Sequence, residues 1–553
     1  MIYDSKYSAA AIPENLDVHT VVFGRELRAS NKTALVDALT GTRVSYRQML
    51  ADIDALVDAL YGTLRFKKWD VVAVLSPNHM QYPIVVHAII KAGGTVSPAN
   101  PTYNHSEFAF QLEDSGAKFI FVHPAVLSVA LAAAKQVGIP ESRIILFNDS
   151  SVSYPGPARR TISQISSENT KAAPTVTFSR KDVMTKPAYL CYSSGTTGLP
   201  KGVETTHYNI ISNVLQFEAY QKNRREVYSG DVFTGHLRDD FGTSLVFPKY
   251  ELELFLKSLQ KYQVTVSHIV PPILLQIAKS PIVNQYKFPK LRAFMSGAAP
   301  LAPELCHAIY DKLGVFVHQG FGLTETSPIT HMLPQSLCLK FPSSIGHLIP
   351  NVQARLVSPE TGLDVAPTKE GELWIRGPNV MKGYHNNPKA TAESIDQDGW
   401  FHTGDIAIVD ENGLFYIVDR LKELIKYKGF QVAPAELEAY LLEHPAIADV
   451  AVIGRADEVG GEIPRAFVVL KVWCVLSMIL PKLKLQQRQP NVKCTEGEII
   501  QFIDAKVSPH KKLRGGVEFV NEIPKSASGK ILRRILREKD AETVKKLKAK
   551  LPC

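Results

Sequence analysis

Continuous apolar runs alternate with helical patterns over residues 33–150, and this alternation limits the fold more than any other feature of the chain. Val71–Leu75 and Phe119–Val122 are apolar throughout, and Tyr82–Lys91, which lies between them, has helical spacing. Strands that are apolar on both faces and separated by helices are typical of parallel sheets with helices on both sides. The pattern therefore predicts an α/β fold.

The pattern changes twice further along the chain. A second α/β stretch is expected over residues 185–350, whereas residues 352–418 have short strands and frequent turns, which predicts a β-rich unit. After Arg420 the pattern returns to mixed α and β. We therefore expect a large N-terminal domain, residues 1–419, with two doubly wound α/β subdomains and a small β-rich subdomain. A small α+β C-terminal domain is expected over residues 420–553.

Composition excludes several classes of protein. An apolar share of 45% and a charged share of 21% exclude a wholly disordered chain. No apolar run reaches the roughly 20 residues that span a bilayer, and the first residues lack a secretory signal pattern. The six cysteines are widely scattered, which favours free thiols in a reducing compartment.

The net charge of +9 is concentrated near the C-terminus, where residues 511–553 have 13 Lys and Arg against 5 Asp and Glu. No nucleic-acid-binding module accompanies these cations. We therefore expect them to serve a polyanionic small molecule, such as a nucleotide or CoA, and we expect no nucleic-acid partner.

The segment Tyr192–Gly202 contains three glycines, several hydroxyl side chains and one lysine, and it follows an apolar run. Glycines permit the left-handed turns that point successive backbone N–H groups at one anion. The order of residues differs from a Walker A loop, because Lys201 is followed by glycine. The segment predicts a triphosphate- or pyrophosphate-binding loop; the alternative is a flexible surface loop.

Five more segments follow this loop in order along the chain: Ser296–Leu301, Gln319–Glu325, Gly399–Asp405, Asp419–Phe430 and Pro524–Leu532. Together with the loop, they resemble the motifs of the adenylate-forming enzymes, specifically the 4-coumarate–CoA ligase-like acyl-CoA ligases. The resemblance extends from about residue 20 to about residue 540. It implies the fold described above, with a C-terminal domain that rotates between two half-reactions.

The resemblance also implies a reaction. A carboxylic acid and ATP, with Mg²⁺, give an acyl-adenylate and pyrophosphate, and the thiol of coenzyme A then displaces AMP. Two alternatives remain open: a stand-alone adenylation enzyme that loads a carrier protein, and an ATP-binding protein that is catalytically impaired.

The roles that the resemblance implies fall on named residues. Lys530, Thr324 and Glu325 are the expected catalytic residues, with Glu325 also the Mg²⁺ ligand, and Asp419 is the expected hinge. The expected ATP- and AMP-binding residues are Ser193, Ser194, Gly195, Thr196, Thr197, Gly198, Lys201, Gly297, Ala298, Ala299, Gln319, Gly320, Phe321, Gly322, Asp405 and Arg420. The expected CoA-binding residues are Lys428, Gly429 and Phe430, and the expected acyl pocket contains Pro271, Ser296, Pro328 and Ile329.

The residues alone leave a plainer interpretation for two of these positions. Lys530 could be a solvated lysine of a basic tail, and Phe321 could be a core aromatic. The family more often has tyrosine at the position of Phe321.

Two segments depart from the family. A stretch that contributes a histidine and a helix to the acyl pocket is missing between Leu237 and Phe241, and Val472–Cys494 interrupts an otherwise continuous match. One hypothesis covers both departures, namely a mispredicted or alternatively spliced transcript.

The expected partners are a small carboxylic acid, ATP and CoA, with an acyl carrier protein or downstream biosynthetic enzymes of secondary metabolism as further candidates. The apolar pocket suggests an aromatic or medium-chain acid. The expected location is the cytoplasm. The peroxisome is the alternative, because Ala549–Leu551 resembles a targeting tripeptide but is followed by two residues.

Overall fold

The computed structural model describes residues 1–553 except 25, 150–151, 153–158, 170, 194–199, 225–231, 235–241, 298–300, 422, 429, 458–460, 472–494, 508, 526–528 and 549–553. The predicted gap at 237–241 and the predicted insertion at 472–494 therefore lie outside the described residues. Within the described part of the chain, no helix combines the length and the apolar character needed to cross a membrane.

The first N-terminal sheet is parallel at its centre and carries two antiparallel strands at one edge. Its strand order is β19 (Gly383–Tyr384), β9 (Lys201–Thr206), β8 (Pro187–Ser193), β5 (Thr95–Ala99), β4 (Val71–Leu75), β6 (Phe119–Val122) and β7 (Ile144–Leu146). The helices of this region are α1 (Val18–Phe23), α2 (Tyr46–Gly62), α3 (Tyr82–Lys91), α4 (His105–Ser115), α5 (Leu127–Val137), α6 (Ile162–Glu168), α7 (Arg180–Thr185) and α8 (His207–Arg224).

Both faces of this sheet are buried, as the continuous apolar strands predict. Val72 and Val74 of β4 belong to the core that contains α2 and α3, whereas Ala73 and Leu75 belong to the core that contains α4 and α5. Alternate residues of one strand thus pack against different helix layers, which is the doubly wound arrangement.

The second sheet has the order β16 (His347–Leu348), β15 (Ile329–Met332), β14 (Phe316–Gly322), β13 (Ala293–Ser296), β12 (Val266–Ile269), β10 (Val232–Thr234), β11 (Thr243–Val246), β2 (Thr33–Asp37) and β3 (Arg43–Ser45). Helices α9 (Leu252–Lys261), α10 (Pro271–Lys279) and α11 (Pro303–Leu313) supply its apolar core. Sheet membership crosses the division expected from the sequence: β2 and β3 join the second sheet, and β8 and β9 join the first.

The predicted β-rich unit is an antiparallel sheet with the order β1 (Tyr3–Asp4), β17 (Gln353–Val357), β18 (Gly371–Arg376), β20 (Phe401–Val409) and β21 (Phe415–Arg420). The short helix α12 (Pro388–Ser394) lies between β18 and β20 in the chain. The chain start contributes β1, so this sheet also ties the first residues to the rest of the N-terminal domain.

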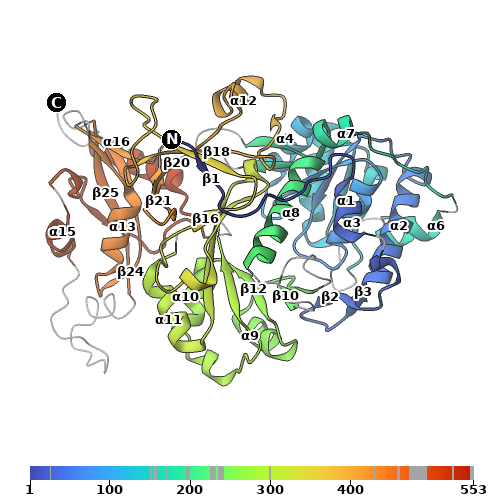
Figure 1. The fold of residues 1–553 in the computed structure, drawn as a ribbon, viewed down its shortest axis with the longest axis horizontal. Coiled ribbons are helices and arrows are strands. Elements are labelled where there is room, and N and C mark those ends of the chain that lie inside the picture. The colour runs from blue at the N-terminus through green and yellow to red at the C-terminus, as the bar shows by residue number, and fades with distance from the viewer. Residues whose placement is uncertain are drawn as a thin grey trace.

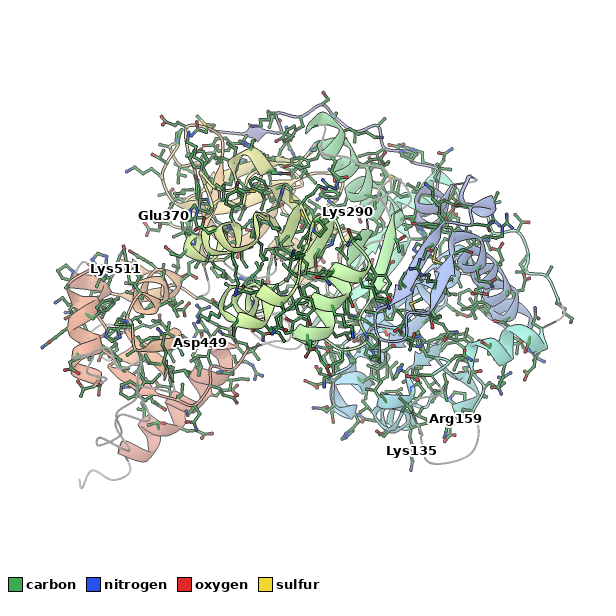
Figure 2. All side chains as sticks on the ribbon, turned by 90° about the horizontal axis from the view of Figure 1, so that it is seen from below. Lys135, Arg159, Lys290, Glu370, Asp449 and Lys511 are labelled. Carbon is green, nitrogen blue, oxygen red and sulfur yellow. The ribbon has the colours of Figure 1, made fainter. Side chains whose placement is uncertain are left out.

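The C-terminal residues form a separate α+β unit, seen at one end of the molecule in Figure 1. Its sheet has the order β23 (Phe430–Val432), β22 (Ile425–Tyr427), β25 (Gly461–Leu470) and β24 (Ile447–Asp457), and β26 (Val517–Phe519) also pairs with β25. Helices α13 (Pro434–Leu442), α15 (Glu496–Asp504) and α16 (Arg533–Lys548) complete it. In Figure 2, Lys511 marks this unit at one end, and Arg159 marks the first N-terminal subdomain at the other.

Candidate active site

The predicted phosphate loop is the turn of a hairpin. Strands β8 and β9 are antiparallel, and Ser193 is the cross-strand partner of Lys201, so the two ends of the loop lie side by side. Ser194, Gly195, Thr196, Thr197 and Gly198 lie outside the described residues. The Nζ atom of Lys201 lies 4.8 Å from the ring centroid of Tyr384, on β19. The hairpin thus presents one hydroxyl and one cation at the base of the loop.

Glu325 lies opposite this hairpin in a short 3₁₀ turn, Thr324–Thr326, that follows β14. The side chain is buried, and its Oε1 atom accepts hydrogen bonds from Ser193 Oγ at 3.2 Å and from Tyr384 Oη at 3.0 Å. Burial, reinforced by Glu325, raises the pKa of Tyr384. Tyr384 therefore remains a hydrogen-bond donor, and the structure brings Ser193, Lys201, Thr324 and Glu325 into one place.

Asp405 and Arg420 are cross-strand partners on β20 and β21. Arg420 Nε lies 3.2 Å from Asp405 Oδ1, while the buried Oδ2 atom has no hydrogen-bond donor among the described residues. Burial raises the pKa of Asp405 to about 6, against the influence of Arg420 and Lys530. A buried acceptor without a donor is rare in folded proteins. Asp405 Oδ2 is therefore suited to accept a hydrogen bond from a ligand hydroxyl.

Lys530, in the C-terminal domain, interacts electrostatically with the carboxylates of Asp405 and Glu325. Burial lowers the pKa of Lys530, and Arg420 lowers it further, whereas Glu423, Asp405 and Glu325 oppose the shift. The preceding glycine packs against α10, because a Cβ atom added to Gly529 would lie 2.6 Å from Cγ of Pro272. The structure therefore places the Lys530 motif against the acyl-pocket side of the N-terminal domain.

The predicted adenine segment runs along β13 and β14. A Cβ atom on Gly297 would lie 3.4 Å from the Gly320 carbonyl oxygen, and one on Gly322 would lie 2.0 Å from the Pro328 carbonyl oxygen. The ring of Phe321 contacts that of His331 edge-on, with 5.8 Å between the centroids. Phe321 also packs against the core of the β-rich subdomain, so this predicted adenine-binding residue makes core contacts as well. The Gln319 amide donates to the Pro342 carbonyl, and Ala298 and Ala299 lie outside the described residues.

The predicted acyl-pocket residues lie at the carboxyl ends of parallel strands. Pro271 begins α10 just after β12, Ser296 ends β13, and Ile329 pairs with Gly322 at the end of β14. Ligands of open α/β sheets bind at this edge. The buried Ser296 hydroxyl has no hydrogen-bond partner among the described residues, and Pro328 follows Ser327 through a cis peptide bond.

Of the predicted CoA-binding residues, Lys428 follows β22 and Phe430 is the first residue of β23. Lys428 has a positive φ of 48°, and its Nζ atom lies 5.7 Å from the ring centroid of Tyr427. Gly429 and the side chain of Phe430 lie outside the description. Among the contacts of the described residues, none joins Lys428 to Glu325, Asp405 or Lys530.

Asp419 links the two domains. One carboxylate oxygen accepts a hydrogen bond from Ala435 N, in the first turn of α13, at 3.0 Å, and the other accepts from Arg420 N at 2.7 Å. Burial raises the pKa of Asp419. The predicted hinge residue therefore caps the first helix of the C-terminal domain.

Sequence reasoning missed a set of buried amides that fix the segment carrying Glu325. Asn379 Nδ2 donates to the Thr326 and Ile329 carbonyls at 2.8 and 3.1 Å, and Asn213 of α8 exchanges hydrogen bonds with the backbone of Ile329. Gln216 Nε2 donates to Asn379 Oδ1 at 3.4 Å. The signal was available, because Asn209, Asn213 and Gln216 recur at helical spacing. Tyr384 was also missed.

Residues 25–239 and 240–385 match the AMP-binding enzyme family, and residues 436–530 match the AMP-binding enzyme C-terminal domain. The first match breaks between Asp239 and Asp240, inside the segment where we predict missing residues.

Two relatives match nearly end to end. A probable 4-coumarate–CoA ligase 2 of Dictyostelium discoideum and a 4-coumarate–CoA ligase-like 1 of Arabidopsis thaliana are each 37% identical over 97% of this chain and 97% of their own length. The ATP-bound structure of MatB from Rhodopseudomonas palustris is 24% identical and shares the fold, with a TM-score of 0.79 over 95% of this chain and 99% of that one. These findings confirm the predicted family and fold class: the chain belongs to the AMP-binding enzyme family.

Proposed function

We propose that this chain is an AMP-forming acid–CoA ligase, which activates a carboxylic acid with ATP and transfers the acyl group to the thiol of coenzyme A. The observation that carries the proposal is that Lys530 of the C-terminal domain interacts electrostatically with Asp405 and Glu325, which belong to two other motifs in the N-terminal domain. The family match supports ATP, and the relatives named 4-coumarate–CoA ligase support CoA as the acceptor.

In the first half-reaction, a carboxylate oxygen of the acid attacks the α-phosphorus of ATP. A P–O bond forms, the bond from that phosphorus to the bridging oxygen breaks, and pyrophosphate leaves. The protein contributes mainly position and charge. The Lys530 ammonium stabilises the charge that develops between acid and phosphate, while Asp405 Oδ2 accepts a hydrogen bond from the ribose. Ser193 and Lys201 hold the polyphosphate at the base of the hairpin.

In the second half-reaction, the thiol sulfur attacks the acyl carbon, the C–S bond forms, and the C–O bond to AMP breaks. We assign Lys428, Gly429 and Phe430 to the approach of CoA and Asp419 to the hinge between the two arrangements. We assign the two half-reactions to different placements of the C-terminal domain.

The donor set at Glu325 fits Mg²⁺ that arrives with ATP. Among the described residues, no three His, Cys, Asp or Glu side chains gather to form a protein-only metal site. Mg²⁺ usually keeps several waters and binds through one or two carboxylates plus phosphate oxygens. We assign Glu325 as its protein ligand; when bound, the ion would neutralise phosphate charge.

The acyl pocket favours an aromatic or medium-chain acid. Pro271, Pro328 and Ile329 provide apolar surface, and the Ser296 hydroxyl provides one hydrogen-bonding group. The 4-coumarate named in the relatives is an aromatic acid of this kind.

The test is pyrophosphate release by the full chain with ATP, Mg²⁺ and a panel of carboxylic acids. We expect release to depend on one class of acid and to fall by about 10²-fold or more in Lys530→Ala, because a positioned charge is lost. Lys506→Ala is the matched control, since that lysine pairs with Glu443 at the surface of the same domain. ATP binding without release for any acid would replace the proposal with a catalytically impaired binder, and transfer to a carrier protein but not to CoA would make it a loading enzyme.

We propose the cytoplasm as the location, with the peroxisome as the alternative. Cys191, Cys306 and Cys338 form no disulfide within the described part of the chain, which suits a reducing compartment. Imaging of an N-terminally tagged chain distinguishes the two.

A further inference from the structure

The loop that carries Lys530 is closed at its base. Lys525 and Ile531 form an isolated antiparallel bridge, and Leu532 N donates to the Pro524 carbonyl at 2.8 Å. The described tip, Gly529, touches Pro272 of the N-terminal domain. A closed base limits the loop but does not set the direction in which its tip points, so a second restraint is needed.

Arg533 supplies such a restraint immediately behind the loop, at the first position of α16. Its Nη2 atom lies 2.7 Å from both carboxylate oxygens of Glu438 on α13, and its Nε atom donates to the Val452 carbonyl on β24 at 3.1 Å. Its Nη1 atom binds Glu423, in the connection between β21 and β22. One side chain, only 11% exposed, therefore joins three separate parts of the domain.

The charges make this restraint specific. Glu438 is buried, and burial raises its pKa to about 7, while Arg533 and a hydrogen bond from Val452 N oppose the shift. Glu423 binds Arg533 directly and also interacts electrostatically with Lys530. The planar guanidinium can meet these partners at once, which an ammonium cannot do. Lys530, Glu423, Arg533 and Glu438 thus form a continuous chain of charged groups from the site into the domain.

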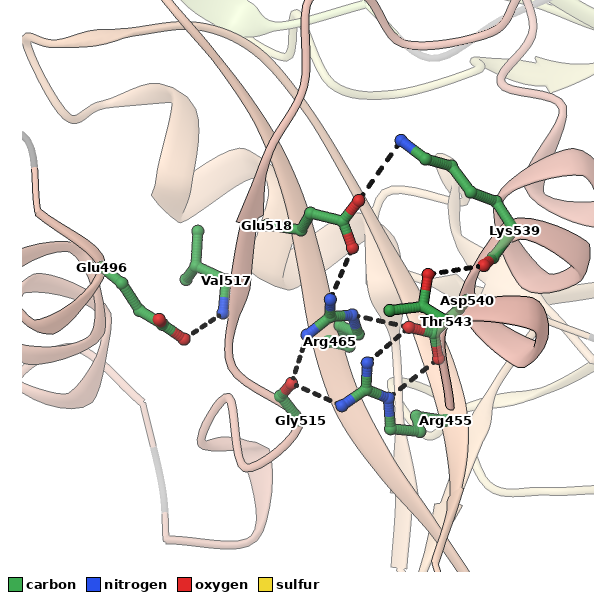
Figure 3. A network of polar contacts seen from close by, with 9 residues as sticks. All are labelled: Arg455, Arg465, Glu496, Gly515, Val517, Glu518, Lys539, Asp540 and Thr543. Atoms are coloured by element: carbon green, nitrogen blue, oxygen red, sulfur yellow. Dashed lines mark hydrogen bonds and ion pairs between the residues drawn. The ribbon is translucent and has the colours of Figure 1, made fainter. Parts of the chain in front are cut away.

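A second ionic network anchors the same helix without reaching Lys530. Asp540, two turns along α16, binds Arg455 Nε at 2.8 Å and Arg465 Nε at 2.7 Å, and Arg465 also binds Glu518 (Figure 3). At the centre of this network, Asp540 is 5% exposed and Arg465 is 11% exposed. The network therefore provides an internal comparison for residues that merely hold α16 in place.

We propose that Arg533 is a positioning residue for adenylation, which binds Glu438 and Glu423 so that Lys530 points at Asp405 and Glu325. The inference rests on the proposed function. Because Lys530 serves the first half-reaction, Arg533 is needed for acyl-adenylate formation and is dispensable for thioester formation from a preformed adenylate.

The test measures the two half-reactions separately on the full chain. Adenylation is followed by acid-dependent pyrophosphate release, and thioester formation by adding CoA to the synthetic acyl-adenylate of the accepted acid. We expect Arg533→Met to slow pyrophosphate release about 100-fold at saturating ATP, because small misplacements of a catalytic group cost this much. The KM for ATP and the rate of thioester formation should stay within about threefold in the same variant, since neither depends on the position of Lys530.

Three variants separate positioning from folding. Arg533→Lys keeps the positive charge but loses the planar set of guanidinium donors. We expect its adenylation rate to exceed that of Arg533→Met by only a small amount. Arg534→Met removes a neighbouring arginine that is 69% exposed, and we expect no change. Asp540→Asn weakens the second network, and we expect a lower melting temperature with both half-reactions affected equally.

The inference is overturned if Arg533→Met slows both half-reactions alike, or if Asp540→Asn shows the same selective loss. Should Arg533→Met fail to fold, Glu423→Gln replaces it, since it leaves the Arg533–Glu438 pair intact; a selective loss of adenylation supports the inference and unchanged adenylation overturns it. If the wild-type chain releases no pyrophosphate with any acid, the proposed function is overturned as well. If the wild type is active and the Arg533 variants release pyrophosphate at the same rate, only the inference is overturned.

Discussion

The N-terminal sheets and the C-terminal domain bury their polar side chains in opposite ways. The N-terminal region buries uncharged imidazoles: burial lowers the pKa of His19 to about 2, of His331 to about 3 and of His87 to about 4. The C-terminal domain buries carboxylates, and Glu438 and Asp540 are paired with arginines. Packing stabilises the first region, whereas packing and paired charges together stabilise the second. The two regions should therefore unfold under different conditions.

Among its described residues, the N-terminal region also buries Asp419, which accepts hydrogen bonds from Ala435 N and Arg420 N, and the carboxylates Glu325 and Asp405 of the candidate site. A buried charge is costly without compensation. A bound ligand is therefore expected to supply partners for the buried carboxylates of the candidate site.

The largest expected effect tests packing in the N-terminal region. Phe121 of β6 is fully buried, so Phe121→Ala should lower the free energy of unfolding by about 3–5 kcal/mol. Urea denaturation measures the loss, and hydrogen exchange should localise it to peptides from residues 33–150. The exposed Leu363→Ala is the control, and a loss no larger than in this control would contradict a packing-dominated region.

The next effect tests charge pairing in the C-terminal domain. Glu438→Ala leaves the buried Arg533 without its bidentate partner and should cost about 3 kcal/mol. Hydrogen exchange in peptides from residues 447–470 reports the loss. Glu443→Ala removes an exposed carboxylate just beyond the same helix and should change little. Equal effects of the two variants would show that the buried pairs do not stabilise this domain.

Acid should weaken the N-terminal region through its histidines. The pKa of each buried imidazole is lowered on folding, so the unfolded chain binds more protons below pH 6.5, and stability falls as the pH falls. Between pH 7 and pH 5, each of His19, His87 and His331 should contribute a loss of about 2 kcal/mol. His87→Gln should flatten the pH dependence of unfolding, while the exposed His307→Gln should not; equal slopes would argue against the buried imidazoles.

The smallest expected effect comes from a more exposed ion pair at the base of the loop that carries Lys530. Lys525 binds Asp449 at 2.6 Å, and each side chain is 32% exposed. Lys525→Met should change the free energy of unfolding by less than about 1 kcal/mol, because solvent screens such pairs. Thermal unfolding and pyrophosphate release check this together, and a loss comparable to that of Glu438→Ala would remove the distinction between buried and exposed pairs.

Local pattern predicted many elements of the first sheet but not their partners. The apolar runs at Val71–Leu75 and Phe119–Val122 are strands, and Tyr82–Lys91 is a helix, as expected. The pairing of β2 with β11 joins residues far apart in the chain, and periodicity carries no information on such pairing. This is why the division between the two sheets differs from the expected one.

The sequence likewise predicted some residues of the candidate site and not others. The motif residues Glu325, Asp405 and Lys530 could be named because their order along the chain resembles a known family. Tyr384 lies in a two-residue strand, and Arg533 lies in a run of cations where the sequence does not distinguish a buried arginine from an exposed one. Their contributions depend on tertiary contacts, which only the fold reveals.

The hydrogen bond from Ala435 to Asp419 has a consequence for populations. The rotation that we propose for the small domain about Asp419 would separate this carboxylate from the start of α13, which would then lose this hydrogen bond. Helix caps contribute about 1 kcal/mol, and this difference corresponds to about a fivefold ratio between two states at equilibrium. On the proposed function, this hydrogen bond would favour the adenylation arrangement over the CoA arrangement in the ligand-free chain.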